Sequence, residues 1–136
     1  MDRKIYKEIF SRLQTLGILD ETGVMKVSYM RFQSPGLMDL HVDRLSNLSN
    51  NTIALAHNGL QNGDIMADPD MQVWIHADHK EAEAMTFQND YLGIYQEVYP
   101  EPGKFNSKLK KELNIFLHDW LTNIINAKYK LVETEE

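Results

Sequence analysis

Two segments at the ends of the chain show the spacing of apolar residues that is typical of amphipathic helices. In the first, apolar side chains recur every three or four residues, at Ile5, Ile9, Phe10, Leu13 and Leu16. Gly17 then stands where a C-terminal cap is expected, which indicates that the helix ends there. A longer helix is predicted over residues 107–127, with an apolar stripe formed by Leu109, Leu113, Phe116, Leu117, Trp120, Leu121 and Ile124.

Between the helices, apolar and polar residues alternate as they do in strands with one buried face. The alternation predicts six strands, at residues 24–32, 37–45, 52–60, 70–77, 82–88 and 91–99. Ser34-Pro35-Gly36 and Asn89-Asp90 have the composition of tight turns. Residues 61–69 are expected to form a loop, because Asn62-Gly63 and Asp68-Pro69 are both turn signals.

These elements predict an α+β domain. Short turns join antiparallel neighbours, whereas parallel neighbours would need long crossovers, so the strands should form an antiparallel meander of about six. The N-terminal helix and the long C-terminal helix must bury their stripes against that sheet. One domain is expected over residues 1–130, followed by a charged tail, residues 131–136, that is expected to fray.

The charge of the chain argues against a broad nucleic-acid-binding surface. The 136 residues carry a formal net charge of −6, and phosphate binding needs clustered cations. The basic residues are scattered apart from Lys108, Lys110 and Lys111, which are expected on a solvated helix face. A moderate negative charge is typical of a protein that simply stays in solution.

The chain contains no cysteine, which excludes disulfides, thiolate metal sites and a cysteine nucleophile. The N-terminus opens directly into the first helical pattern, and no segment approaches the roughly 20 apolar residues of a membrane span. A cytoplasmic protein without a membrane segment is therefore expected.

The predicted loop carries most of the candidate chemistry. His57, at the end of the third predicted strand, is followed closely by polar and turn-forming residues that include Gln61, Asn62, Asp64, Asp68 and Asp70. His57, Asp64, Asp68 and Asp70 could hold a divalent metal ion, because carboxylate and imidazole ligands suit Mg²⁺, Mn²⁺ or Zn²⁺. The same residue types also build turns without any ligand, and the spacing matches no known metal-binding motif.

Two interpretations of His57 remain open. It continues the apolar row of Ile53 and Leu55, so it should point inward at the end of the sheet. A buried histidine with satisfied hydrogen bonds would be structural, whereas an accessible one could act as a base near neutral pH.

The late strands supply a second candidate surface. If they are neighbours, alternation places the rings of Trp74, Tyr91, Tyr95 and Tyr99 on one face, with Glu97 among them. An exposed aromatic patch would mark a surface for a partner or ligand. If a helix covers that face instead, the same rings belong to the core.

Residues 57–71 also carry a resemblance. The run His-Asn-Gly-Leu-Gln-Asn-Gly-Asp-Ile-Met-Ala-Asp-Pro-Asp-Met resembles a family of small domains of unknown function carried by bacterial plasmids, conjugative elements and phages. That family has a His…Gln-Asn-Gly-Asp…Asp-Pro-Glu-Met core, often followed by an aromatic strand, whose place residues 95–99 take here. Asp70 stands where glutamate is commoner. The similarity spans most of residues 24–127 and implies a bacterial or phage accessory protein, without supplying a reaction.

The sequence thus favours a non-enzymatic domain that binds a protein partner without a cofactor, using the His57–Asp70 segment or the aromatic face. No phosphate-binding glycine loop, GxSxG turn or HExxH helix is present. The alternative is a small metal-dependent hydrolase, in which a metal ion activates water in place of a protein nucleophile. A symmetric dimer through the second sheet face also stays open.

Overall fold

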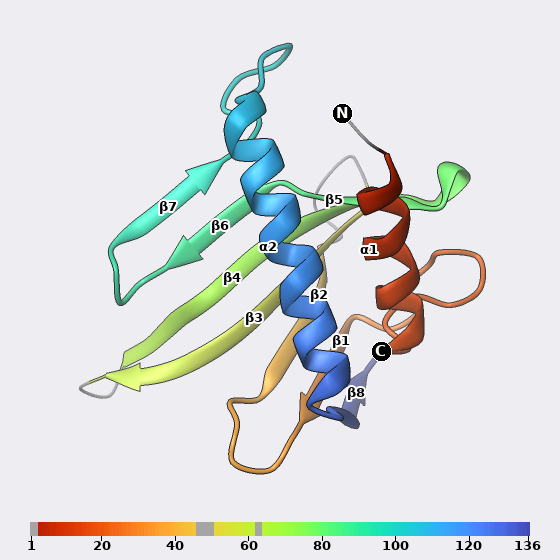
Figure 1. The fold of residues 1–136 in the computed structure, drawn as a ribbon. Helices are drawn as coiled ribbons and strands as arrows, with labels where there is room; N and C mark the ends of the chain where they lie inside the picture. The colour runs from red at the N-terminus through yellow and green to blue at the C-terminus, as the bar shows by residue number, and fades with distance from the viewer. Residues whose placement is uncertain (1–2, 46–50, 62–63) are drawn as a thin grey trace.

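A computed structural model describes residues 3–45, 51–61 and 64–136 of the chain. Two helices lie on one face of an open antiparallel sheet of eight strands (Figure 1). This arrangement confirms the predicted α+β class, with one helix near the N-terminus and one near the C-terminus.

Both helices lie where the apolar spacing predicts them. Helix α1 spans Lys4–Thr15 and buries Tyr6, Ile9, Phe10 and Leu13. Helix α2 spans Ser107–Asn126 and begins after Asn106, whose side-chain oxygen accepts a hydrogen bond from the backbone N–H of Leu109 at 3.0 Å. No described helix has the length and apolar character needed to cross a membrane.

The strands form one sheet with the order β7-β6-β4-β3-β2-β1-β8, and β5 pairs with a second stretch of β4. Their bounds are β1 (Tyr29–Gln33), β2 (Leu40–Leu45), β3 (Thr52–Gln61), β4 (Asp64–His76), β5 (Glu81–Ala84), β6 (Thr86–Asn89), β7 (Ile94–Glu97) and β8 (Lys130–Glu135). A short 3-10 turn, η1 (Ala77–His79), joins β4 to β5. Consecutive strands from β1 to β4 are neighbours, as the predicted meander requires.

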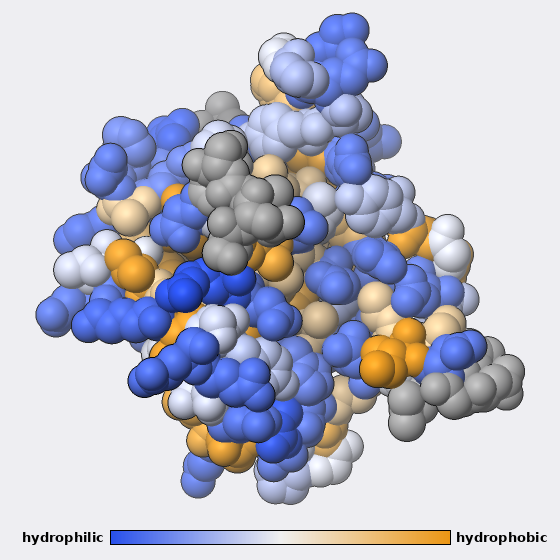
Figure 2. Space-filling view, turned by 180° about the vertical axis from the view of Figure 1, so that it is seen from behind, coloured by the Kyte–Doolittle hydropathy of each residue, from blue (hydrophilic) through white to orange (hydrophobic). Residues whose placement is uncertain are grey.

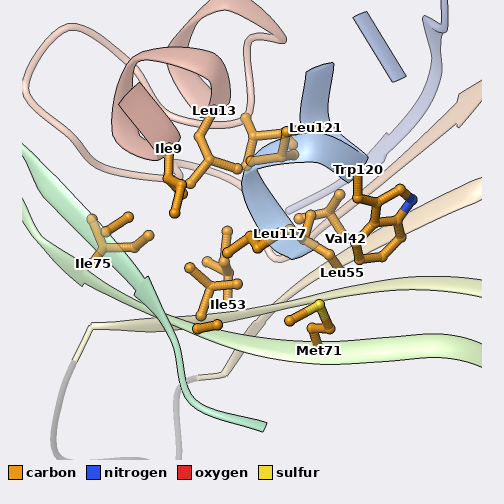
Figure 3. Packing of buried hydrophobic residues seen from close by; sticks show 14 of the residues in the cluster. Ile9, Leu13, Val42, Ile53, Leu55, Met71, Ile75, Leu117, Trp120 and Leu121 are labelled. Atoms are coloured by element: carbon orange, nitrogen blue, oxygen red, sulfur yellow. The ribbon is translucent and has the colours of Figure 1, made fainter. Parts of the chain in front are cut away.

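The core lies between the helices and the sheet (Figure 3). Its strand side chains come from alternate positions, and its helix side chains from the two apolar stripes: Val42, Ile53, Leu55, Met71, Val73, Ile75, Ile9, Leu13, Leu117 and Leu121. Fully burying one such side chain stabilises the fold by roughly 1.5–3 kcal/mol. The alternate positions of the central strands therefore face away from both helices.

The prediction of a loop at residues 61–69 is wrong for those of its residues that the structure describes. Strand β4 already begins at Asp64, and Gln61 pairs with it, so β3 and β4 form a long hairpin. Its outer part, residues 56–61 and 64–70, is called the hairpin arm below. The predicted Asn62-Gly63 turn lies outside the described residues. The sequence places turn-forming residues within the arm, and backbone pairing across it outweighs their local preference.

The late strands are shorter than predicted. The strand at 82–88 breaks at Met85 into β5 and β6, and the one at 91–99 reduces to β7. The apolar side chains of Leu92 and Ile94 are 69% and 36% exposed. Strand β7 is at the edge of the sheet, so these side chains have little to pack against. The first strand also begins later than predicted, at Tyr29.

The tail was expected to fray, but it forms strand β8, which pairs with β1. Arg31 of β1 donates a hydrogen bond to the carboxylate of Glu133 at 2.9 Å, which fixes the charged residues of the tail on the sheet. The solvated position expected for Lys110 is also wrong. Its amine lies 3.7 Å from the carboxylate of Glu83 and 5.2 Å from the ring centre of Phe105.

Candidate functional site

His57 points toward the helix layer, as its place in the row of Ile53 and Leu55 predicts. Its Nδ1 lies 3.0 Å from the backbone carbonyl oxygen of Asp39. Because a carbonyl only accepts hydrogen bonds, Nδ1 carries the proton and Nε2 is the acceptor of the ring. Burial lowers the pKa of His57, so the imidazole stays neutral near pH 7.

Aromatic rings surround this imidazole. The ring of Trp120 meets that of His57 edge-on at a centroid distance of 5.3 Å, and the ring of Tyr129 lies at 5.9 Å. These residues line a cleft of about 250 Å³ between the C-terminal half of α2 and the segment that leads into β2. The Nε1 of Trp120 is buried and has no hydrogen-bond partner among the described residues.

Two carboxylates, Asp68 of the hairpin arm and Asp90 of the turn after β6, join these two segments. The carboxylate of Asp68 accepts a hydrogen bond from the side chain of Asn89 at 3.1 Å. In return, the carboxylate of Asp90 accepts one from the backbone N–H of Ala67 at 2.8 Å. The peptide bond between Asp68 and Pro69 is cis, within a bulge where these two residues oppose the single residue His57. The Asp-Pro pair is thus structural here.

The four residues predicted as metal ligands are not brought together. His57 faces the helices, Asp70 lies on the opposite face of the sheet, and Asp64 is exposed at the end of the arm. Within the described ranges, no group of three or more His, Asp or Glu residues is positioned to hold a metal ion. Asn62, predicted as a binding residue, lies outside the described residues.

The sheet face opposite the helices carries two rows of polar residues across its strands. Strand pairing aligns Tyr29, Asp43, Ala54 and Gln72 in one row. The other row contains Arg31, His41, Ala56, Asp70, Gln88 and Tyr95. The two alanines put the smallest side chains between the acids of β2 and β4.

Asp70 is an acid of this face whose surroundings disfavour its charge. Burial raises its pKa, and the negative charges of Asp43 and Asp90 raise it further. Between the two rows, the hydroxyl oxygen of Tyr29 lies 2.5 Å from Nδ1 of His41, and the two rings stack. The centre of this face therefore combines negative charge with aromatic surface.

The predicted aromatic surface is divided. Tyr95 and Glu97 lie at one end of the same face, whereas Tyr99 packs against the core and its ring centre lies 5.5 Å from the amine of Lys110 of α2. The hydroxyl of Tyr95 donates to the carboxylate of Glu97 at 2.9 Å, and both line a hollow of about 180 Å³ together with Tyr99. The ring of Trp74 contacts that of Tyr99 at a centroid distance of 6.3 Å. Tyr91 was predicted on the same strand face as Tyr95 and Tyr99. It lies instead in the turn before β7, where it approaches Gly59.

Two functional candidates were not found from the sequence. Trp120 belongs to the apolar stripe of α2, and nothing in the sequence indicates that its indole N–H would lack a hydrogen-bond partner. Asp43 was not singled out, because only the pairing register shows that it shares a face with Asp70.

The family model described as Domain of unknown function (DUF6908) matches residues 4–129. The chain belongs to the DUF6908 family. The expected membership in a family of small domains of unknown function is confirmed to this extent. No curated protein and no protein of solved structure matches this DUF6908 chain.

Proposed function

We propose that this DUF6908 protein is a non-enzymatic accessory domain that binds a protein partner through the sheet face opposite its helices. One observation carries the proposal: both helices lie on the same face of the sheet (Figure 1). The acids Asp43, Asp70 and Glu97 and the ring of Tyr95 therefore lie on the face that the helices leave uncovered.

The chemistry of this face favours a basic partner. Asp43 and Glu97 are exposed, Asp70 is half-buried beside them, and the ring of Tyr95 is 57% exposed. Carboxylates next to aromatic rings suit arginine or lysine side chains, which form ion pairs and stack on ring faces. Figure 2 shows this side of the molecule, where hydrophilic and hydrophobic residues lie next to each other.

A bacterial plasmid, conjugative element or phage is the setting we propose for this protein, acting in the cytoplasm. The similarity of residues 57–71 to domains of such elements supports the setting, and the absence of cysteine suits a reducing compartment. A partner would then be a protein of the host cell or of the element itself.

The test compares capture by the wild-type protein with capture by a charge-reversal variant of the face, Asp43→Lys with Glu97→Lys. Both residues are exposed, so the variant should keep the fold. A control with equal charge change, Glu21→Lys with Glu112→Lys, alters exposed acids elsewhere. We expect one basic protein from bacterial lysate to be retained by wild type and control, to elute with salt, and to be lost with the face variant.

Equal capture by all three proteins would contradict a role for this face, and so would no specific capture at low salt. Sedimentation of the purified proteins covers the dimer that the sequence leaves open. If the wild type is a dimer and the face variant a monomer, the partner is a second copy of the chain.

A further inference from the structure

The cleft beside His57 contains a buried hydrogen-bond donor that the fold leaves unsatisfied. Trp120 is only 8% exposed, and its indole N–H has no partner in the described part of the chain. The indole nitrogen points away from the side chains of the core cluster (Figure 3). Buried donors are almost always paired in native proteins, so this one calls for an explanation.

An acceptor lies next to this donor. Nδ1 of His57 donates a hydrogen bond to the backbone carbonyl of Asp39, which leaves the lone pair of Nε2 able to accept one. The rings of His57 and Trp120 meet edge-on with their centroids 5.3 Å apart, so a donor and an acceptor lie close together in one cleft.

The remaining walls decide what kind of group could use this pair. The ring of Tyr129 and the side chains of Leu37 and Met38 form apolar walls, and none of the described residues around the cleft is an acid, a lysine or an arginine. Its volume of about 250 Å³ lies below the roughly 300–1,000 Å³ of sites for drug-sized ligands. The small volume and the lack of cations exclude a nucleotide, whose phosphates would need positive charge.

We propose that this cleft binds an uncharged planar heterocycle of the nucleobase type, which accepts a hydrogen bond from Trp120 Nε1 and donates one to His57 Nε2. Every nucleobase presents an acceptor and a donor side by side on one edge, and this pattern complements the pair in the cleft. The ring of Tyr129 supplies an aromatic surface against which the ligand packs.

Two side chains at the mouth of the cleft are exposed and can move. Leu37 and Met38 are 53% and 41% exposed there, and methionine adapts readily to a new neighbour. The indole N–H has almost no exposed surface of its own, so a ligand reaches it only when a neighbouring side chain moves aside.

The chain offers a direct spectroscopic test, because it contains two tryptophans and each gives one indole N–H signal. Uracil and hypoxanthine are titrated into the full-length, ¹⁵N-labelled protein, and Trp74→Phe assigns the two signals. We expect the Trp120 signal to shift and saturate while the Trp74 signal stays in place. The methylated analogues 1,3-dimethyluracil and caffeine, which lack the N–H donor, should cause no saturable shift.

Two variants separate the hydrogen bonds from the apolar contacts. Trp120→Phe removes the indole N–H and keeps an aromatic ring, and His57→Phe removes the acceptor. Each should weaken binding of uracil or hypoxanthine about tenfold by calorimetry, whereas Trp74→Phe should leave it unchanged. The proposal is overturned if neither base gives a saturable shift at millimolar concentration, or if the methylated analogues bind equally well. This comparison of ligands uses the wild-type protein, so it holds even where a variant fails to fold.

Discussion

The ionised carboxylate of Asp70 destabilises the folded state. It sits half-buried on the sheet face, near the negative charges of Asp43 and Asp90. Burial and these charges raise its pKa, so the folded state holds this proton more tightly than the unfolded state does. Functional sites often keep such unfavourable groups because the charge serves binding.

At pH 7 the ionised Asp70 should therefore destabilise the fold. Replacing it in Asp70→Asn removes the charge and keeps the shape, so we expect the free energy of unfolding to rise by up to about 1 kcal/mol in urea denaturation. The gain should shrink as the pH falls through the raised pKa of Asp70, because the wild-type carboxyl then becomes neutral as well. Asp78→Asn, at an exposed acid of η1, is the control and should change little. Lower stability of Asp70→Asn at pH 7 would contradict this account.

At the scale of elements, contacts between hairpins position the arm. A β-carbon added at Gly59 would clash with the hydroxyl oxygen of Tyr91, so the tyrosine ring would have to shift to admit a side chain there. The carboxylates of Asp68 and Asp90 join the same two segments by hydrogen bonds. The β6–β7 turn and the arm thus behave as one packed unit.

Gly59→Ala should break this contact. We expect a loss of roughly 1–3 kcal/mol in the free energy of unfolding, the usual cost of overpacking. Tyr91→Phe removes the hydroxyl that causes the clash, so the same Gly59→Ala change should cost clearly less in that background. A double-mutant cycle in urea measures the difference, and equal costs in both backgrounds would exclude the contact.

The helices were predictable from the sequence because their signals are local. Apolar spacing and the glycine after α1 depend on neighbouring residues only. The arm was missed for the opposite reason, since Asp68-Pro69 has a strong turn preference that pairing with β3 overrides. For the candidate site, the inward position of His57 followed from alternation, but its contacts with Trp120 and Tyr129 join segments far apart in the sequence.

At the scale of the whole molecule, the fold is a layer of helices on one side of a sheet. Which face stays open depends on where both helices pack, and sequence alone left that undecided. Strand β8 was missed because its charged sequence resembles a tail, and its pairing with β1 joins residues roughly a hundred positions apart.

Strand β8 should contribute substantially to global stability. Deleting residues 130–136 removes its backbone pairing with β1, the ion pair between Arg31 and Glu133, and the contact of Leu131 with the sheet edge. We expect a loss on the order of 3 kcal/mol. The melting temperature should fall by roughly 10 °C in calorimetry. Removing Glu136 alone is the control, and an unchanged melting temperature in the longer deletion would show that β8 is dispensable.

The pairing of β1 with β8 also has a consequence for synthesis on the ribosome. Strands β2, β3 and β4 can pair as soon as each has been made, because they are neighbours in sequence as well as in the sheet. Strand β1 has to wait for its second partner until about a hundred further residues, up to β8, have emerged. Its outer edge, with unpaired backbone groups, is then open to other nascent chains. The period before β8 emerges is therefore when this protein most needs a chaperone.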